Sequence, residues 1–179
     1  AWRPGRMKWI HRRVDHVVVI LPFEPELYRR AGVRCTFVGH PLLDAVAPQY
    51  DRAALRRKFG LDESARVVGL LPGSRVREVE MLLPVLLDAA AQLHAAEPGM
   101  QFILAQASSI HDHLIQSLLK NSPVPVRVAY DQASEVMALS DVLFIASGTA
   151  TLQAAVVGTP MVLLYKTTPV TYRLARWLI

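Results

Sequence analysis

The sequence contains a single cysteine, Cys35, among its 179 residues. One cysteine excludes an internal disulfide, and without a second thiolate a cysteine-based metal cluster is not expected, so a reducing compartment fits best. The chain also lacks a recognised nucleic-acid-binding motif and any repeat that alternates aromatic with basic residues. DNA and RNA are therefore not expected as partners.

Neither a secretory signal pattern nor an uninterrupted membrane-spanning run is evident in the sequence. The most apolar segment, VLFIASGTATLQAAVVGTPMVLLY at 142–165, is broken by Gly, Ser, Thr and Pro, which predicts a buried strand, helix and strand. The chain begins with AWRPGRMKW and ends with YRLARWLI, inside an amphipathic helical pattern. We therefore expect a fragment of a longer protein.

The hydrophobic share of 52% in 179 residues is enough for one good core, or for one domain and part of another. Charge is unevenly distributed: residues 1–58 carry 12 Lys and Arg against 5 Asp and Glu, or +7, whereas residues 59–179 carry 8 against 10, or −2. Five basic residues gather around Trp2 and Trp9, namely Arg3, Arg6, Lys8, Arg12 and Arg13. Such a cluster suits an anionic partner such as membrane headgroups or a polyphosphate, although a solvated helix face is an equally simple interpretation.

Hydrophobic periodicity predicts two series of strands and helices. In the first, a helix over 5–13 precedes the β-branched run DHVVVILP at 15–22, the short helix PELYRRAG closed by Gly32, and the strand RCTFVG at 34–39. The following segment, HPLLDAVAPQY, is punctuated by proline and has no clear period. It predicts a linker near 41–50.

The second series begins at Asp51, which is placed to cap a helix that ends at Gly60. The nearly all-apolar strand ARVVGLLP at 65–72 is followed by a long helix from Arg77 to Ala96, and further strands are expected at 101–106, 124–130, 141–146 and 161–165. Helices are expected between them, near 110–120 and 132–139 and from about 150. This alternation predicts an α/β fold with a Rossmann-like, doubly wound parallel sheet.

Ligands of such sheets bind beyond the carboxyl ends of the strands, and two strand ends here carry unusual residues. The first reads LLPGSRVREVE. Gly73 allows close approach of the backbone, Ser74 offers a hydroxyl and a helix cap, and Arg75 presents a fork of donors suited to phosphate. The alternative is that Arg75 pairs with Glu78 for purely structural reasons.

The second strand end reads FIASGTATLQ. Ser147, Gly148 and Thr149 stand where a helix begins, and free N–H groups and the helix dipole favour an anion there. The segment lacks the lysine of a P-loop and the three-glycine spacing of a dinucleotide fingerprint, so neither an ATPase nor an NAD-binding domain is favoured. Hydroxyl groups that only cap the helix are the alternative, but a diphosphate held between the two strand ends accounts for both motifs.

Four stretches, AWRPGR, LPFEPELYRRAGVRCTFVGHPLLD, LLPGSRVREVEMLLP and SGTATLQAAVVGTPMVLLYKTTPVTYRLAR, closely resemble the lipid-A-disaccharide synthase family. These enzymes are bacterial glycosyltransferases of the GT-B type. The resemblance implies that residues 1–40 end the N-terminal acceptor domain, 41–50 link the domains, and 51–179 form an incomplete UDP-sugar-binding domain. Most of the N-terminal domain and the C-terminal end of the family would be missing.

The resemblance also implies a reaction. UDP-2,3-diacylglucosamine donates its sugar to 2,3-diacylglucosamine 1-phosphate with inversion and without a cofactor or metal, at the inner face of the inner membrane of a Gram-negative cell. The family's expected catalytic Asp would lie upstream of residue 1, so this chain alone should only bind the donor. A two-domain chain leaves open a homodimer that exchanges domains.

By the same resemblance, Gly73, Ser74 and Arg75 face the donor phosphates, and Ser147, Gly148 and Thr149 cradle the diphosphate. The family typically has Glu where this chain has Gln153, a position expected to accept hydrogen bonds from the ribose. Glutamine lacks the charge and half of the acceptor capacity, which predicts weaker UDP binding. His40 is expected near the cleft between the domains, or else to act as a hinge residue.

Other polar residues carry weaker signals. The HDH triplet at 111–113 lacks a third ligand and is interpreted as a solvated helix cap rather than a metal site. Asp44 and Asp131 lie near strand ends without a partner that would identify either as a base, and Tyr165 and Lys166 end a strand on the ligand side. A UDP-N-acetylglucosamine epimerase and a non-catalytic basic module that docks on membranes remain the alternative functions.

Overall fold

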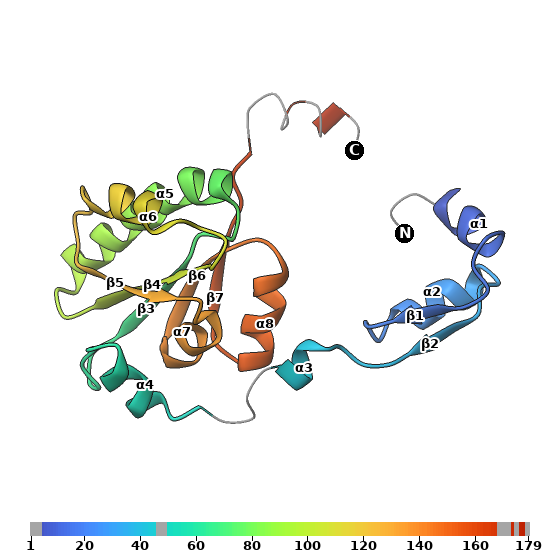
Figure 1. Ribbon diagram of the computed structural model, residues 1–179, viewed down its shortest axis with the longest axis horizontal. Helices are drawn as coiled ribbons and strands as arrows, with labels where there is room; N and C mark the ends of the chain where they lie inside the picture. Colours follow the sequence, from blue (N-terminus) through green and yellow to red (C-terminus); the bar gives the residue numbers. More distant parts are fainter. Residues whose placement is uncertain (1–4, 46–49, 168–172, 174–175, 178–179) are drawn as a thin grey trace. The chain divides into compact units, whose positions relative to one another are not determined.

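A computed structural model describes residues 5–45, 50–167, 173 and 176–177. The chain divides into two compact units, residues 1–47 and 48–179, and the division falls within the segment expected to be a linker. Figure 1 labels the elements of both units. Trp2 and Arg3 of the basic cluster lie outside the described residues.

The first unit is a small parallel β-α-β arrangement. Its elements are α1 (Gly5–His11), β1 (Val17–Val19), α2 (Glu24–Arg30), β2 (Cys35–Phe37) and α3 (Leu42–Ala45). Strands β1 and β2 pair in parallel, with Val17 opposite Cys35. The Glu24 carboxylate accepts a hydrogen bond from the Leu21 N–H at 2.9 Å and so closes the turn into α2. The expected linker is more regular than its sequence indicates, because α3 forms within it.

The second unit contains five strands and their connecting helices. In chain order these are α4 (Arg52–Lys58), β3 (Val67–Leu71), α5 (Val76–Ala96), β4 (Gln101–Gln106), α6 (Asp112–Leu119), β5 (Val126–Tyr130), α7 (Ala133–Leu139), β6 (Val142–Ala146), α8 (Thr149–Val157) and β7 (Met161–Leu164). The expected alternation is therefore confirmed. Asp51 caps α4 as predicted, since its carboxylate accepts from the Ala54 N–H at 2.9 Å.

The five strands form one parallel sheet in the order β5-β4-β3-β6-β7. The chain moves outward from β3 through β4 to β5, then returns to place β6 on the other side of β3. This reversal is a topological switch point, and the loops that follow β3 and β6 flank it. The doubly wound sheet predicted from the sequence is confirmed.

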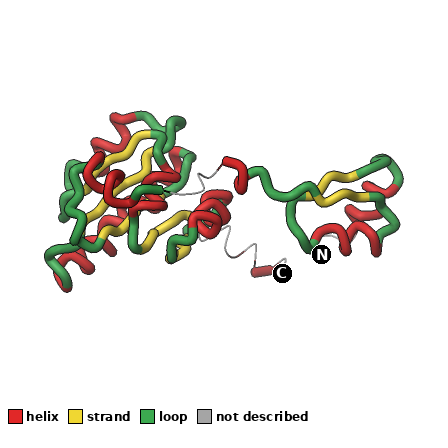
Figure 2. The backbone as a smooth tube through the Cα atoms, turned by 90° about the horizontal axis from the view of Figure 1, so that it is seen from below, coloured by secondary structure: helices red, strands yellow, loops and turns green. Residues whose placement is uncertain are grey.

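Helices cover both faces of this sheet (Figures 1 and 2). One buried cluster includes Val67, Ile103 and Val136, and the other includes Leu70, Leu83 and Leu104. Every residue of β3 is buried, which explains why its sequence is apolar throughout rather than alternating.

Helix α5 supplies the largest apolar stripe of the second unit. The helical period predicts an apolar stripe of Val79, Leu82, Leu83, Leu86, Leu87 and Leu93. The first five are buried together with Ala90, and Leu93 is half-buried against the same core. Among the described residues, α5 is also the one helix long and apolar enough to cross a membrane by length and composition. Because its apolar face packs into the core of the second unit, we assign it as a core helix.

Candidate functional site

The loop after β3 has a backbone shape that requires glycine. Gly73 has a φ of +112°, which side-chain-bearing residues rarely adopt. A Cβ atom at this position would lie 2.6 Å from Glu78 Oε2 and 3.1 Å from the Glu78 Cβ. Gly73 therefore allows the loop to pack closely against the first turn of α5, and the expected close approach of a ligand to its backbone stays a prediction.

The predicted cap of α5 is wrong. The N-cap position is Arg75 and not Ser74, and no side chain caps this helix. Ser74 instead contributes its carbonyl oxygen, which accepts a hydrogen bond from the Ser109 hydroxyl at 2.7 Å. This bond ties the loop that follows β4 to the loop that follows β3.

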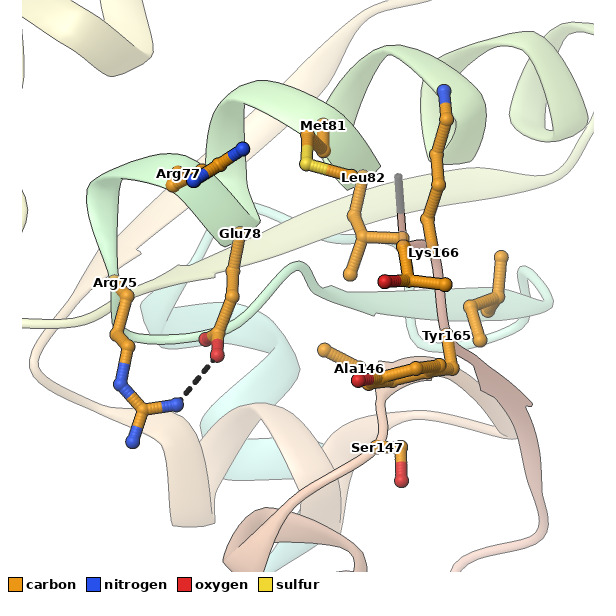
Figure 3. A pocket seen from close by; sticks show the side chains of 11 residues that line it. Arg75, Arg77, Glu78, Met81, Leu82, Ala146, Ser147, Tyr165 and Lys166 are labelled. Carbon is orange, nitrogen blue, oxygen red and sulfur yellow. Dashed lines mark hydrogen bonds and ion pairs between the residues drawn. The ribbon is translucent and has the colours of Figure 1, made fainter. Parts of the chain in front are cut away.

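Arg75 pairs with Glu78, as the structural alternative predicted. Arg75 Nη1 donates to Glu78 Oε1 at 2.6 Å, and the two side chains are 80% and 35% exposed (Figure 3). The pair spans one helical turn, so it orients the guanidinium over the start of α5. One nitrogen is used in this contact, and a guanidinium has five N–H donors in total, so Arg75 retains donors for an anion.

The turn between β6 and α8 presents backbone N–H groups rather than capping hydroxyls. Helix α8 begins at Thr149 with Gly148 as its N-cap, a residue without a side chain that could satisfy the first N–H groups. The Thr151 hydroxyl donates to the Gly148 carbonyl oxygen at 2.7 Å and so takes no part in capping. The start of α8 therefore has the geometry expected of an anion-binding turn.

A pocket of about 370 Å³ brings the two loops together. Six of the seven predicted donor-site residues line it: Gly73, Ser74, Arg75, Ser147, Gly148 and Thr149. Its volume is in the range of small-molecule sites. The pocket opens at the carboxyl ends of the strands because β3 and β6 are neighbours in the sheet.

A second pocket of about 330 Å³ adjoins the first and shares Arg75, Glu78 and Ser147 with it. Its other lining residues include apolar Met81 and Leu82 from α5, and Tyr165 and Lys166 from the end of β7 (Figure 3). Tyr165 and Lys166 thus lie beside the candidate site, as their position at a strand end predicted.

Gln153 does not line either of these pockets. Its amide nitrogen donates to the Ser134 hydroxyl at 2.7 Å, which links α8 to α7. His40 belongs to the first unit, where its Nδ1 accepts from the Leu42 N–H at 3.1 Å at the start of α3. Its expected position near a cleft stays a prediction.

The HDH triplet has a structural role at the start of α6. His111 is the N-cap but its side chain makes no capping bond. The Asp112 carboxylate accepts from the Gln106 amide at 2.6 Å, so the triplet is held to the end of β4 rather than merely solvated. Within the described ranges, no group of three His, Cys, Asp or Glu side chains is arranged to hold a metal ion.

Two residues of the first pocket carry no role in the sequence-based assignment. Gln106 is only 5% exposed and ends β4, and Asp131 follows β5 with a φ of +52°. Gln106 could have been identified from the sequence, because it is a polar residue at the end of the apolar strand QFILAQ. Asp131 was identified from the sequence only as a carboxylate near a strand end. It lines this pocket because of the strand order, which the sequence did not predict.

The whole chain is similar in sequence to one family of known proteins. The family model described as lipid-A-disaccharide synthetase matches residues 1–179. Lipid-A-disaccharide synthases of Geobacter sulfurreducens and Trichlorobacter lovleyi are 48% and 46% identical to the chain over 179 residues. Each match covers 100% of this chain and 47% of the relative, so the chain spans about half the length of these proteins.

Solved glycosyltransferase structures share the fold. Anabaena Alr3699/HepE in complex with UDP and glucose aligns with a TM-score of 0.51 at 18% identity, over 88% of this chain and 46% of that chain. Spinosyn rhamnosyltransferase SpnG complexed with thymidine diphosphate aligns with a TM-score of 0.50 at 20% identity, over 91% of this chain and 51% of that chain. At these identities the likeness extends to the GT-B fold alone.

Proposed function

The chain belongs to the lipid-A-disaccharide synthetase family, and from this premise we propose that it is the donor-binding part of a hexosyltransferase of lipid A biosynthesis. The proposed reaction transfers the sugar of UDP-2,3-diacylglucosamine to 2,3-diacylglucosamine 1-phosphate. The bond between the anomeric carbon and the diphosphate breaks, the 6-hydroxyl of the acceptor forms a new bond at the opposite face, and UDP leaves.

One observation carries the proposal: Arg75 and the turn Ser147–Thr149 line a single pocket. Negative charge develops on the diphosphate as the bond to the sugar breaks, so fixed donors at that point lower the barrier. The guanidinium of Arg75 and the N–H groups at the start of α8 are donors of this kind. A general base for the acceptor hydroxyl is proposed to lie outside this chain, so the chain itself binds the donor and does not turn it over.

The ligands of the structural neighbours are consistent with this assignment. HepE is described with UDP and glucose and SpnG with thymidine diphosphate, both of which contain a nucleoside diphosphate. The family match favours the synthase over an epimerase on the same scaffold, and the SGTATLQ turn departs from the Ser-Gly-Gly turn expected of those epimerases.

Calorimetric titration of the chain with UDP tests the proposal. We expect Arg75→Ala to weaken UDP binding about tenfold or more, because a charge-assisted hydrogen bond contributes roughly 1.5–3 kcal/mol. Arg66→Ala is the matched control, since Arg66 forms a remote surface pair with Glu97 at 3.4 Å. Equal UDP affinities of the wild type and Arg75→Ala would contradict the proposal.

We further propose that the protein is peripheral on the cytoplasmic face of the inner membrane, with the basic cluster near α1 facing anionic lipid. Helix α1 has no buried residue, Trp9 is 55% exposed, and the Arg13 guanidinium lies 4.8 Å from the centre of the Trp9 ring. Exposed aromatic and basic side chains together suit a headgroup layer. Flotation with lipid vesicles tests this surface, and sedimentation equilibrium tests the homodimer that a two-domain chain leaves open.

A further inference from the structure

A third pocket, of about 530 Å³, lies at the opposite edge of the five-stranded sheet, where β4 and β5 begin. The loop before β3, the end of α5 and the first residues of β4 and β5 form it, and we refer to it as the amino-end pocket. Strand β4 has six residues, or a length of roughly 17 Å, so it separates this pocket from the candidate donor pocket. The volume is in the range of small-molecule sites, and the proposed function does not use it.

His94, in the last turn of α5, lines the amino-end pocket. Among the described side chains that are not exposed, its Nδ1 is the one buried nitrogen or oxygen without a hydrogen-bond partner. Orphaned buried N–H groups are rarer than orphaned buried acceptors, which favours an imidazole that carries its proton on Nε2. The ring contacts the Phe102 ring edge-on, with 6.3 Å between the centroids. Nε2 is therefore an N–H donor that a ligand can use.

Two further donor side chains line the same pocket. Gln101 Oε1 accepts from the Asp62 N–H at 2.8 Å, and this bond orients the amide so that its nitrogen is left to donate elsewhere. The Arg127 side chain extends from β5 over Gly60, where Nη2 would lie 3.8 Å from an added Cβ. Within the described ranges no carboxylate pairs with Arg127, so its guanidinium keeps its donors for a ligand.

The acceptors of the pocket are fewer than its donors. Asp62 is its one carboxylate, and Asp62 Oδ1 accepts from both the N–H and the hydroxyl of Ser64 at 2.8 Å. Much of the remaining wall is apolar, namely Leu61, Ala65, Met100, Phe102 and Val126. A ligand that matches both parts has oxygen acceptors at one end and an apolar body at the other.

We propose that the amino-end pocket binds a small monocarboxylate with a compact apolar body, whose carboxylate pairs with the Arg127 guanidinium. The planar fork of arginine matches a carboxylate with two parallel hydrogen bonds. His94 Nε2 and the Gln101 amide nitrogen are further donors for the same group, and the apolar wall takes the body of the ligand. Inorganic phosphate leaves that wall without a contact. This second site goes beyond the proposed function and does not depend on it.

NMR titration of the isotope-labelled chain with benzoate tests the inference. Benzoate should shift the signals of Gln101, Phe102 and Arg127 and bind about tenfold more tightly than benzyl alcohol, which cannot form the charge-assisted pair. Arg127→Gln should weaken benzoate binding about tenfold and leave UDP binding unchanged. His94→Phe keeps an aromatic ring against Phe102 and should weaken benzoate binding severalfold, because it removes one neutral hydrogen bond.

Lys120→Gln is the matched control, because it removes an exposed positive charge of the same unit outside the pocket. Equal benzoate affinities of the wild type and Arg127→Gln would overturn the inference, as would a folded wild type that does not bind benzoate. Signal changes confined to the donor pocket around Arg75 and Ser147 would overturn it too. Phosphate that binds as tightly as benzoate would exclude an apolar body. UDP binding that depends on Arg75 and not on Arg127 keeps the proposed function separate from each of these outcomes.

Discussion

At the scale of single residues, Gly73 shows how a site is built before any ligand enters. Its positive φ turns the chain from β3 into α5, and the space that a Cβ would need is occupied by Glu78. Glu78 in turn holds Arg75. Because Gly73 has no side chain, Glu78 can occupy this space and form the ion pair that orients the Arg75 guanidinium at the pocket.

We expect Gly73→Ala to lower the free energy of unfolding by about 2 kcal/mol, because an unfavourable backbone conformation costs roughly 1–3 kcal/mol and Glu78 must also move. Urea denaturation measures this change. Gly99→Ala is the control, since nothing lies within 4 Å of the added Cβ and its φ lies outside the left-handed region. Equal unfolding midpoints for Gly73→Ala and Gly99→Ala would show that the loop adapts without cost.

At the scale of elements, Asp141 joins α4 to the sheet. Its carboxylate accepts from Arg52 at 2.5 Å, from Arg56 at 2.8 Å and from the Val67 N–H at 2.7 Å. Arg56 is 7% exposed, and its remaining donors contact the carbonyl oxygens of Glu63, Ala65 and Leu139. All three nitrogens of the Arg56 guanidinium thus donate to an oxygen atom, and these bonds compensate for the burial of its charge.

The contacts of the Asp141 carboxylate predict that the free energy of unfolding depends on pH. Burial by itself would raise the pKa of Asp141, but the Val67 N–H and the guanidinium groups of Arg52 and Arg56 outweigh burial and lower this pKa. A folded-state pKa below the unfolded one means that the carboxylate stabilises the fold above its ordinary pKa of about 4. This contribution is lost as the pH falls through the folded-state pKa.

We expect Asp141→Asn to reduce the free energy of unfolding by about 2 kcal/mol at neutral pH, since it weakens charge-assisted bonds to a buried cation. Urea denaturation from pH 7 down to pH 3 should show the difference from wild type narrowing below about pH 4. Asp88→Asn removes the same charge at an exposed position on α5. A difference between Asp141→Asn and wild type that is constant with pH would exclude this role for the Asp141 carboxylate.

At the scale of the whole molecule, the two units differ in charge and in burial. Residues 1–47 carry 8 Lys and Arg against 4 Asp and Glu, or +4, whereas residues 48–179 carry 12 against 11, or +1. Exposed Arg6, Lys8, Arg12 and Arg13 contribute to the charge of the first unit. The second unit contains the five-stranded sheet and both large buried clusters. The exposed basic cluster near α1 and the proposed donor pocket therefore belong to different units of the chain.

Flotation should recover the chain with vesicles that contain anionic lipid and not with neutral vesicles. Replacing Arg12 and Arg13 with Gln should weaken this binding roughly thirtyfold, because each basic residue near an anionic surface contributes about 1 kcal/mol. Arg66→Gln with Lys120→Gln makes the same change in net charge within the second unit. If both double variants bind equally, the basic cluster near α1 is not the membrane-facing surface.

The sequence by itself determined the local features of this protein. The order of strands and helices, the Asp51 cap and the buried stripe of α5 all follow from residues that are near in sequence, where periodicity and capping chemistry act. Gly73–Arg75 and Ser147–Thr149 could be proposed as phosphate-binding segments for the same reason, since each motif is contiguous. The mistaken cap at Ser74 shows the limit of local reasoning, because the first turn of α5 is held by Arg75, Glu78 and Ser109 instead.

Tertiary structure alone decided which of these features meet. The loops after β3 and β6 are more than 70 residues apart and become neighbours because β6 pairs with β3. The same strand order brings Asp131 into the pocket, while the packing of α7 on α8 directs Gln153 to Ser134. Strand order depends on non-local burial of apolar faces, which no short segment of sequence specifies, and so the composition of the site was established only by the fold.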